Sequence, residues 1–514
     1  MIPILTPEQS KSWDQRAVAA GIELATLMET AGRAVAVVLT ERYAHLSRTG
    51  VLIAAGPGNN GGDGWVVARA LHRLEVPVWV TSSGTASELC QRMARLARAE
   101  GVREVSPDGP WPAFGLAVDA LLGTGAAGAP RPAIAALVAR IHDLEVPVLA
   151  VDGPTGVDLA TGVVHGATRA DLTVTFGGLR RGHVLARDEM GNVVVVDIGL
   201  PPPEAGWPTV VTDAQAADWL RRLRARDHKG DRGRVVIIGG STGMTGAIRM
   251  AARAAFAAGA GLVHAVAPAD TVAALVQAEP DLQTLAQAFD QPPSRALLEL
   301  VEKADALAVG PGLGREPGRR EFVAALVEVA QRVVLDADAL VAFGGGIDAL
   351  GRLSQGRSLV LTPHPGEFRT LFPDLASVRE LDPWSAARSA AEASGATLLL
   401  KGVPTVVASA GASLLTVVAG NPGLATGGSG DVLTGLVATA IAQGLEPSIA
   451  AAFGAQALGR AADLAARRHT ARALRPMDVV GALPDLWRQW ELLRIERPAP
   501  RAPHLFELPR PQTT

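Results

Sequence analysis

The stretch GPGNNGGDG, residues 56 to 64, combines a bare backbone with polar side chains. The apolar run VLIAA precedes it, and the helical pattern WVVARALHRL follows it. A glycine-rich turn between a strand and a helix directs backbone N–H groups towards an anion, commonly a phosphate. The spacing fits neither the G-x-G-x-x-G pattern nor the P-loop. The stretch therefore predicts either phosphate binding or no more than a tight turn.

Acidic side chains follow two other apolar runs of the first half. Asp119 ends one run and precedes a second glycine-rich loop over residues 123–129, and Asp152 ends another run with Thr155 close behind. Ligands of an open α/β sheet bind at the carboxyl ends of its strands. We therefore expect these side chains to converge with Asn60 in one crevice.

The oxygen-bearing side chains of Asn60, Asp119 and Thr155 form a candidate cation site. A carboxylate beside a phosphate is repelled unless a cation or a proton lies between them. An oxygen-only set suits an alkali or alkaline-earth ion. Helix capping is the alternative role for Asp119 and Asp152.

A second glycine-rich stretch, AGNPGLATGGSGDVLTG at residues 419 to 435, places Asp431 directly after a glycine and then becomes helical. Its amides can cradle a phosphate, and its carboxylate can accept a proton from an attacking hydroxyl. Only four of the 48 basic side chains are lysines, and two of them, Lys229 and Lys401, lie in glycine-rich motifs. This placement favours a chemical role for both, with chance as the alternative.

The elements that must position these residues form two α/β patterns. A chain of 514 residues is too long for one core. Apolar runs beginning near residues 51, 76, 116, 146, 172 and 193 predict buried parallel strands joined by helices. A helix is expected over residues 7–41 with no strand ahead of it.

A proline-rich break at residues 200–210 and a basic stretch at 218–234 put the domain boundary near residue 215. The α/β pattern then restarts with the apolar run VVIIGG. We predict domains over residues 1–213 and 220–490. The tail over 495–514 is rich in proline and arginine and is expected to be disordered.

Composition narrows the functional classes. A formal net charge of −3 provides no field to gather nucleic acid or an anionic membrane. The chain has no membrane-spanning run and does not start like an exported protein, so we expect a soluble, cytoplasmic protein. Cys90 is the only cysteine, which excludes an internal disulfide and a multi-cysteine metal site.

The motifs GPGNNGGDG, DALLGTG and DGPTGVD, in this order and spacing, resemble the YjeF N-terminal, or NAD(P)H-hydrate epimerase, domain. The resemblance covers roughly residues 1–213 and implies a Rossmann-like three-layer domain. It implies potassium at Asn60, Asp119 and Thr155, where the family usually has serine in place of Thr155. It implies that Asp152 acts at the reacting centre, as an acid and base that protonates the leaving C6 oxygen of the hydrate and guides water back. The implied substrate-binding residues are Asn59, Asn60, Gly61, Gly62, Asp63, Gly123, Thr124, Gly125, Ala126, Ala127, Gly128, Ala129 and Asp152.

The G-x-G-D pattern before the helix at 431 resembles the ribokinase-like superfamily. With HKGDRG, GGSTGMTGA, VGPGLG, LDADAL, TPHPGEF and KGVPT, it follows the order of the YjeF C-terminal, or NAD(P)H-hydrate dehydratase, domain over about residues 220–490. The resemblance implies Asp431 as the catalytic base, and Asp336 and Asp338 could hold Mg or order water. The implied hydrate contacts are Ala247, Gly312, His364 and Asp431. The implied ADP-binding residues are Lys401, Gly402, Val403, Pro404, Thr405, Asn421, Gly427, Gly428, Ser429 and Gly430.

Together the two resemblances imply a bifunctional repair enzyme for hydrated NADH and NADPH, with potassium, ADP and Mg as its small partners. The first domain would interconvert the R and S hydrates, and the second would dehydrate the S form at the expense of ADP. We expect a homo-oligomer without nucleic-acid or membrane partners. One alternative is a ribokinase-like small-molecule kinase with an N-terminal nucleotide-binding module, and another is a first domain that only binds.

Overall fold

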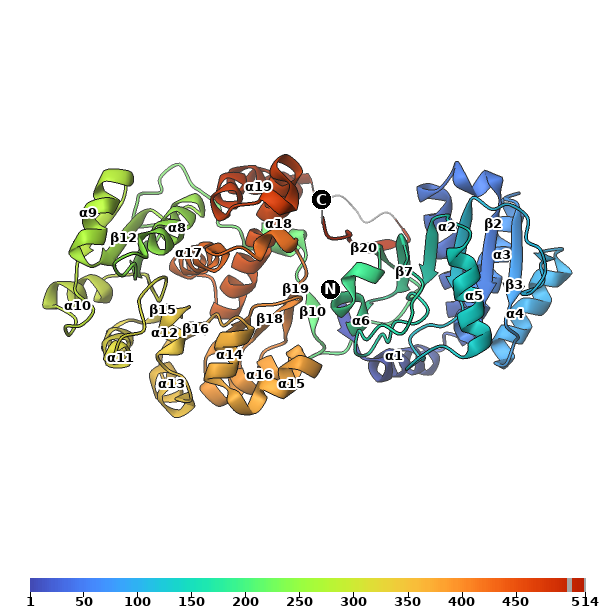
Figure 1. Cartoon of the computed structure of the whole chain (residues 1–514), viewed down its shortest axis with the longest axis horizontal. Helices are drawn as coiled ribbons and strands as arrows, with labels where there is room; N and C mark the ends of the chain where they lie inside the picture. The colour runs from blue at the N-terminus through green and yellow to red at the C-terminus, as the bar shows by residue number, and fades with distance from the viewer. Residues whose placement is uncertain (497–501, 513–514) are drawn as a thin grey trace. The chain divides into compact units, whose positions relative to one another are not determined.

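The computed structural model describes residues 1–496 and 502–512, and these residues form two compact units. The first unit contains residues 1–207 and 502–511, and the second contains residues 208–496. The predicted α/β class and the two-domain organisation are confirmed (Figure 1). The structure divides the chain at residue 207, slightly before the predicted end of the first domain at 213.

The first unit is built on a largely parallel sheet with the strand order β20-β9-β7-β6-β5-β2-β3-β4. Its strands are β2 (Val51–Ala55), β3 (Val78–Ser82), β4 (Arg103–Glu104), β5 (Leu116–Ala120), β6 (Val148–Val151), β7 (Leu172–Phe176), β9 (Asn192–Val196) and β20 (His504–Leu508). Its helices are α1 (Pro7–Ala19), α2 (Leu24–Arg42), α3 (Asn59–Arg73), α4 (Glu88–Ala99), α5 (Pro132–His142) and α6 (Arg181–Leu185). Short 3-10 helices cover Leu46–Thr49 and Arg187–Glu189.

The helices of the first unit form two layers, and alternate side chains of each strand pack against opposite layers. Ile53 packs in the cluster formed with α2, α3 and α4, whereas its neighbour Ala54 packs in the cluster formed with α5. Successive side chains of a strand point to opposite faces, so each strand serves both layers. The sheet is therefore covered on both sides, as its continuous apolar strands predict.

Three sequence expectations for the first unit are wrong. The predicted helix over 7–41 is two helices, because α1 ends at Ala19 and Gly21 adopts a left-handed φ of 91°. A strand does precede it, since β1 (Ile2–Leu5) pairs in parallel with β8 (Leu179–Arg180). The tail is not irregular throughout, because β20 pairs antiparallel with β9.

The remaining parts of the predicted tail have different outcomes. Residues 495 and 496 belong to the last helix, and residues 497–501 and 513–514 lie outside the described residues. The β20 segment is held to the first unit by ion pairs from Arg42 to Glu507 and from His504 to Glu41. Such long-range partners are not visible in the local sequence.

The second unit has a mixed sheet with the order β13-β12-β11-β14-β15-β16-β17-β18-β19-β10. Pairing is parallel except at β18, which runs antiparallel to both neighbours. Its strands are β10 (Thr209–Val210), β11 (Arg234–Ile238), β12 (Leu262–Ala267), β13 (Gln283–Ala286), β14 (Ala306–Val309), β15 (Arg332–Leu335), β16 (Ser358–Leu361), β17 (Thr397–Leu400), β18 (Thr405–Ala408) and β19 (Leu415–Val417).

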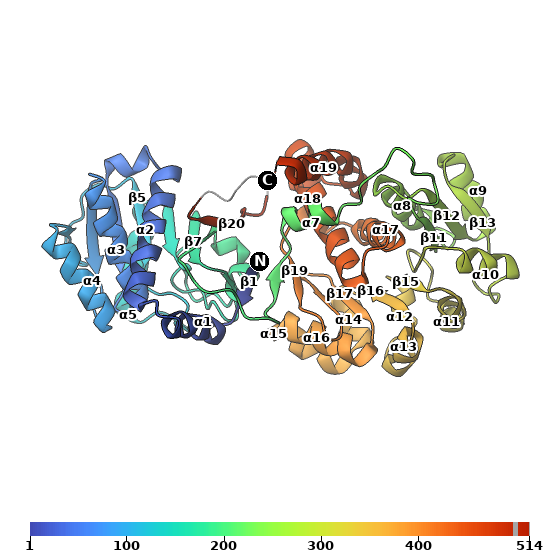
Figure 2. The same ribbon diagram turned by 180° about the vertical axis from the view of Figure 1, so that it is seen from behind.

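The helices of the second unit pack alongside this sheet, and Figure 2 shows α18 and α19 side by side. The helices are α7 (Asp213–Trp219), α8 (Thr245–Ala257), α9 (Ala269–Ala278), α10 (Arg295–Glu302), α11 (Arg319–Val329), α12 (Asp338–Val341), α13 (Ile347–Ser354), α14 (Pro365–Leu371), α15 (Ala376–Leu381), α16 (Pro383–Ser394), α17 (Ser429–Ala442), α18 (Pro447–Ala473) and α19 (Pro476–Glu496). Short 3-10 helices cover Pro373–Leu375 and Pro422–Leu424. Residues 208–219 belong here because Asp213 of α7 binds Gln456 and Arg460 of α18.

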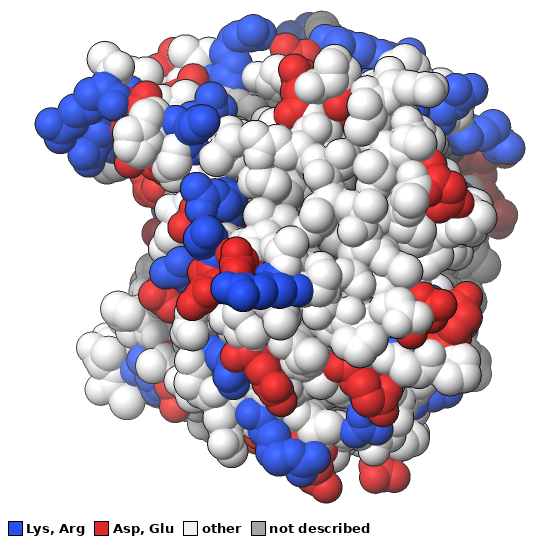
Figure 3. Space-filling view, turned by 90° about the vertical axis from the view of Figure 1, so that its left-hand side faces the viewer, with Lys and Arg blue, Asp and Glu red and all other residues white. Residues whose placement is uncertain are grey.

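Among the described residues, no helix has the length and apolar character needed to cross a membrane. On the face drawn in Figure 3, acidic and basic side chains are interspersed around an area that lacks charged side chains.

Candidate functional sites

A cavity of about 950 Å³ in the first unit collects residues that follow three of its parallel strands. The residues after β2, β5 and β6 that line it are Pro57, Gly58, Asn59, Asn60, Asp63, Leu121, Leu122, Gly123, Thr124, Gly125, Ala126, Ala127 and Asp152. This is the carboxyl end of the sheet, where a ligand crevice was expected. Gly61, Gly62, Gly128 and Ala129, also predicted to bind substrate, do not line the cavity.

Two glycines of the opening motif, Gly56 and Gly61, are required by close backbone contacts. A Cβ at Gly61 would lie 1.8 Å from the carbonyl oxygen of Gly56, and a Cβ at Gly56 would lie 1.7 Å from that of Leu121. Neither position can carry a side chain without moving the backbone. The turn is therefore tight, and it starts α3 at Asn59 beside the cavity.

Asp152 occupies a strained position at the end of β6, with a φ of 64°. Its Oδ2 accepts hydrogen bonds from the backbone N–H of Thr124, at 2.8 Å, and from the Thr124 hydroxyl. Its Oδ1 accepts a hydrogen bond from the Thr175 hydroxyl at 3.1 Å and lies 3.7 Å from the guanidinium of Arg180. Burial alone would raise the pKa of Asp152, but Arg180 and these hydrogen bonds hold it below its ordinary value.

His183 fixes the backbone on which Asp152 sits. Its Nδ1 accepts a hydrogen bond from the backbone N–H of Arg180 at 2.9 Å, and its Nε2 lies 2.6 Å from the carbonyl oxygen of Asp152. Burial lowers the pKa of His183 to about 4, so the ring is neutral at pH 7 and can donate from Nε2 to that oxygen. The ring therefore ties the residues after β8 to those after β6.

Two further carboxyl groups, Asp14 and Asp63, line the same cavity. Burial, together with the carboxylates of Asp152 and Asp14, raises the pKa of Asp63 well above its ordinary value. Burial also raises the pKa of Asp14, although Arg180 opposes this shift. Of these three carboxyl groups, Asp152 is held ionised, whereas the ionisation of Asp14 and Asp63 is disfavoured.

Asp119 and Thr155, two of the three predicted cation ligands, form a fully buried hydrogen-bonded pair. The backbone N–H and the hydroxyl of Thr155 donate to the two Asp119 oxygens at 2.8 and 2.7 Å. In the part of the chain that the structure describes, Asp119 has no ion pair, and burial raises its pKa. A buried carboxylate without a positive partner is a chemically suitable neighbour for a cation.

Asn60, the third predicted ligand, lies on the cavity side. A Cβ at Gly123 would lie 3.1 Å from Asn60 Oδ1 and 3.0 Å from Asp152 Oδ2, so these two oxygens approach the same point. The Nδ2 atom of Asn60 is buried without a hydrogen-bond partner. An orphaned amide of this kind is costly unless a ligand supplies an acceptor.

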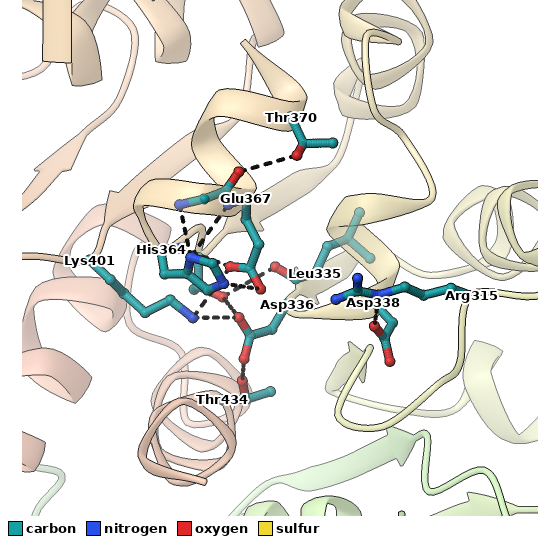
Figure 4. Close-up of polar contacts among 11 residues, drawn as sticks. Arg315, Leu335, Asp336, Asp338, His364, Glu367, Thr370, Lys401 and Thr434 are labelled. Atoms are coloured by element: carbon teal, nitrogen blue, oxygen red, sulfur yellow. Dashed lines mark hydrogen bonds and ion pairs between the residues drawn. The ribbon is translucent and has the colours of Figure 1, made fainter. Parts of the chain in front are cut away.

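The second unit contains an acidic cluster centred on Asp336, which follows β15 and is 2% exposed (Figure 4). Lys401 Nζ lies 2.8 Å from Asp336 Oδ1 and 3.8 Å from Glu367 Oε2. The hydroxyls of Thr362 and Thr434 donate to Asp336 at 2.8 and 2.6 Å. Burial opposes the charge of Lys401, but Asp336 and Glu367 keep its pKa above its ordinary value.

Asp431 lies in the first turn of α17, after the left-handed Gly428 (φ 99°) that caps the helix. Burial and the neighbouring Asp336 carboxylate raise the pKa of Asp431 to about 7, although Lys401 acts in the opposite direction. A Cβ at Gly430 would lie 3.4 Å from Lys401 Nζ, so the loop at 401 and the turn at 430 meet here. A carboxyl group that titrates near neutrality is suited to proton transfer.

The two aspartates considered as Mg ligands, Asp336 and Asp338, both have partners in the structure. Asp336 is paired with Lys401, and Asp338 accepts from the Arg315 side chain at 2.8 Å and from the Gly314 backbone at 3.0 Å (Figure 4). Within residues 1–496 and 502–512, no group of three or more histidine, cysteine or acidic side chains is arranged so that it could hold a metal ion. The two aspartates, which the sequence indicated as possible Mg ligands, thus have cationic partners already.

His364 caps α14. Its Nδ1 accepts from the backbone N–H of Gly366 at 2.9 Å, and its backbone N–H donates to Glu367 at 2.8 Å. The side chain is 55% exposed, so it remains accessible to a ligand. Ala247 and Gly312 are neighbours, since a Cβ at Gly312 would lie 3.3 Å from that of Ala247.

The other predicted nucleotide-binding residues divide into exposed and inward-facing positions. Gly402, Val403 and Gly427 are exposed, whereas Pro404, Asn421 and Ser429 are buried and Thr405 is half-buried. Asn421 uses its side chain inward, accepting from Gly423 and donating to Asp463. Lys229 is exposed and precedes the amino end of β11, away from the strand ends that carry the acidic cluster.

Several residues of both sites were not predicted from the sequence. In the first unit these are Asp14, Thr175, Arg180 and His183. In the second unit they are Thr362, Glu367 and Thr434. Glu367 lies in the quoted motif TPHPGEF, and Arg180 follows a buried strand, which is a weak signal.

Comparison with known proteins gave matches in both units. A family model described as YjeF-related protein N-terminus matches residues 24–182, and one described as NAD(P)H-hydrate dehydratase matches residues 235–485. The bifunctional NAD(P)H-hydrate repair enzyme Nnr of Escherichia coli (strain K12) is 36% identical over 473 residues, which cover 90% of this chain and 89% of that protein. The protein of the same name from Moorella thermoacetica is 37% identical over 500 residues, covering 90% and 92%.

A solved structure also aligns with part of the chain. It is the ADP/ATP-dependent NAD(P)H-hydrate dehydratase from Bacillus subtilis, co-crystallised with ATP/Mg²⁺. The identity is 25% and the TM-score is 0.48, with 55% of this chain and 98% of that chain covered.

Proposed function

Because the chain belongs to the family of bifunctional NAD(P)H-hydrate repair enzymes, we propose that its two units carry separate sites for epimerisation and dehydration. The first unit interconverts the R and S forms of hydrated NADH and NADPH. The second dehydrates the S form at the expense of ADP. The observation that carries this proposal is the presence, in two distinct units, of Asp152 at the end of β6 and Asp431 in the first turn of α17, both inside the matched ranges.

In the first unit, Asp152 is proposed to contact the reacting centre of the hydrate. The C6 hydroxyl of the substrate is next to ring N1, whose lone pair can expel it and leave positive charge on the ring. Arg180 and the hydroxyls of Thr124 and Thr175 keep Asp152 ionised. A preorganised carboxylate at this position stabilises the developing charge. The lining residues Asn59, Asn60, Asp63 and Gly123 to Ala127 would enclose the nucleotide, with Gly61 and Gly62 forming the turn between them and Gly128 and Ala129 extending the second loop.

Potassium is proposed to bind at Asn60, Asp119 and Thr155. The oxygen donors suit an alkali cation, and the buried Asp119 carboxylate has no cationic side chain beside it among the described residues. The cation would offset the repulsion between the carboxylates and the substrate phosphates. Removing potassium, or the change Asp119→Ala, should slow epimerisation and spare dehydration, and equal loss of both activities would contradict this assignment.

In the second unit, Asp431 is proposed to be the base. Hydroxide is a poor leaving group, so the C6 hydroxyl first attacks the terminal phosphorus of ADP, which forms a phosphate ester and releases AMP. Phosphate then leaves C6 together with a proton from C5, which restores the double bond. Asp431 accepts the hydroxyl proton, and the amides of Gly427 to Gly430 at the start of α17 stabilise the transferring phosphoryl group.

Around Asp431, the hydrate would contact Ala247, Gly312 and His364. The loop from Lys401 to Thr405, with Asn421 to Gly430, would bind ADP. We expect the ammonium of Lys401 to divide its charge between the nucleotide and Asp336, which it already contacts. Mg would then be held chiefly by the nucleotide phosphates, because Asp336 and Asp338 are already paired with Lys401 and Arg315.

Fusion of the two activities is chemically useful because spontaneous hydration gives both epimers, whereas dehydration uses one. We further propose a cytoplasmic homo-oligomer that acts on small molecules only. The test is incubation of the full chain with racemic hydrate and ADP or ATP, following the return of reduced-nicotinamide absorbance. Accumulation of a stable phosphorylated product without reduced nicotinamide would support a small-molecule kinase instead.

A further inference from the structure

Epimerisation in the first unit requires a proton donor, because water leaves C6 far more readily than hydroxide does. Asp152 is poorly suited to that task. Its Oδ2 already accepts two hydrogen bonds from Thr124, and its Oδ1 accepts one from Thr175 and faces Arg180. A protonated Asp152 would have to give up at least one of these donors.

Asp63 lies in the same cavity in a different environment. It is the fifth residue of α3, lines the cavity and is half-buried. Within the described residues its side chain has no hydrogen bond or ion pair, so no donor holds it ionised. The nearest charged groups that act on it are the carboxylates of Asp152 and Asp14, and burial with these two raises its pKa well above the ordinary value.

The groups that shift the pKa of Asp63 include no cation. Arg180 is directed at Asp152, and its remaining side-chain hydrogen bonds go to Thr124 and to the carbonyls of Phe176 and Gly178. Burial, together with the Asp63 charge, raises the pKa of the Cys90 thiol of α4 to about 11. The further charged residues that line the cavity are Glu8, Lys11 and Asp158.

We propose that Asp63 is the proton donor and acceptor of the epimerisation, while Asp152 stays ionised throughout. This assignment rests on the proposed epimerase function of the first unit. Asp63 gives its proton to the C6 oxygen, the C6–O bond breaks, and the N1 lone pair forms a C6=N1 double bond as water leaves. Water then adds to the other face of C6, the electron pair returns to N1, and the released proton returns to Asp63.

The experiment measures epimer interconversion by the full chain without ADP, starting from the pure R hydrate and correcting for the spontaneous rate. Because the donor must be protonated, the wild-type rate should fall as pH rises through the pKa of Asp63. Asp63→Asn should lower kcat by roughly 100-fold or more and abolish this falling limb of the pH–rate profile. Asp63→Glu should restore part of the rate together with the limb, and Asp14→Asn, the matched carboxyl control, should keep the limb.

Differential scanning calorimetry of the same preparations reports whether the first unit of each variant is folded, and dehydration of the S hydrate with ADP reports the state of the second unit. If the wild type does not interconvert the epimers, the epimerase function itself fails. If the wild type does so but Asp63→Asn retains its rate and its pH profile, the assignment of Asp63 is overturned and the epimerase function stands. A wild-type profile without a falling limb, or loss of the limb only in Asp14→Asn, would also overturn it.

Discussion

Asp152 and Asp431 are the same residue type beside glycine-containing turns, yet their surroundings are opposite. Asp152 sits in a left-handed backbone conformation, receives hydrogen bonds at both oxygens and faces Arg180. Asp431 sits in a helical turn beside Asp336 and has no hydrogen bond within the described residues. The pKa is lowered in the first case and raised to about 7 in the second. Partner groups, rather than residue type or motif, decide which carboxyl group can exchange protons near pH 7.

The two units also differ in which of their buried carboxylates have a cationic partner. In the second unit, Lys401 neutralises Asp336 and partly offsets Glu367. In the first unit, the Arg180 guanidinium faces Asp152, whereas the fully buried Asp119 has only hydrogen-bond partners among the described residues. A bound cation would therefore be more strongly favoured in the first unit, where a carboxylate is left without a positive neighbour.

The largest effect is expected from Asp431→Asn, which keeps the shape of the side chain but cannot accept the hydroxyl proton. Dehydration of the S hydrate should fall by roughly 100-fold or more. Epimerisation should persist, because its residues lie in the other unit. The rate of return of reduced-nicotinamide absorbance measures the first effect, and undiminished dehydration would remove Asp431 from the role of base.

The close approach at Gly123 gives a second way to separate the sites. In Gly123→Ala, the new Cβ would lie 3.0 Å from Asp152 Oδ2 and 3.1 Å from Asn60 Oδ1. Displacing a reacting group by a fraction of an ångström should slow epimerisation by about tenfold or more. Gly125→Ala is the matched control, since a Cβ there would have no atom within 4 Å. Equal epimerase rates in the two variants would show that the close contact of Asn60 and Asp152 with Gly123 does not affect epimerisation.

The pH dependence of dehydration should follow the ionisation of Asp431. A base must be ionised, so kcat/KM should rise with pH through about 7 and then level off. Asp336→Asn removes the neighbouring negative charge and should move the rise to lower pH, by about one unit. Lys401→Ala should move it to higher pH and weaken ADP binding more than hydrate binding. Shifts in the same direction for both variants would contradict the electrostatic account.

The smallest effect concerns the terminal strand. Ending the chain at residue 501 removes β20, its pairing with β9 and the ion pair from Arg42 to Glu507. The first unit should then unfold a few degrees earlier, while the second is unchanged. Differential scanning calorimetry of both chains measures this, and an unaltered transition of the first unit would show that β20 contributes little.

Local sequence signals were sufficient to predict the strand-to-helix turns. The glycines at 56 and 61 mark a backbone contact, and apolar runs of four or more residues mark the central strands. The same signals indicated Asp152 and Asp431, because an aspartate directly after such a run or turn is visible in the sequence.

Partners that come from distant segments could not be predicted. Arg180 and His183, which follow β7 in the chain, reach Asp152 only after β7 has been placed beside β6, and Lys401 meets Asp336 across 65 positions of sequence. The strand at 504–508 lies in a segment whose composition is typical of disorder, and its partners Glu41, Arg42 and β9 lie more than 300 residues earlier. Tertiary contacts of this kind leave no local pattern.

The separation of the two sites is tested most directly by one progress curve. Racemic hydrate and ADP are given to the full chain carrying Asp152→Asn, and the return of reduced nicotinamide is followed to completion. The account predicts two phases, with the S half repaired at the wild-type rate and the R half then limited by slow spontaneous epimerisation, whereas the wild type consumes nearly all of the racemate without a pause. A single, complete phase from the Asp152→Asn protein would contradict the claim that the first unit is the epimerase and Asp152 its catalytic carboxylate.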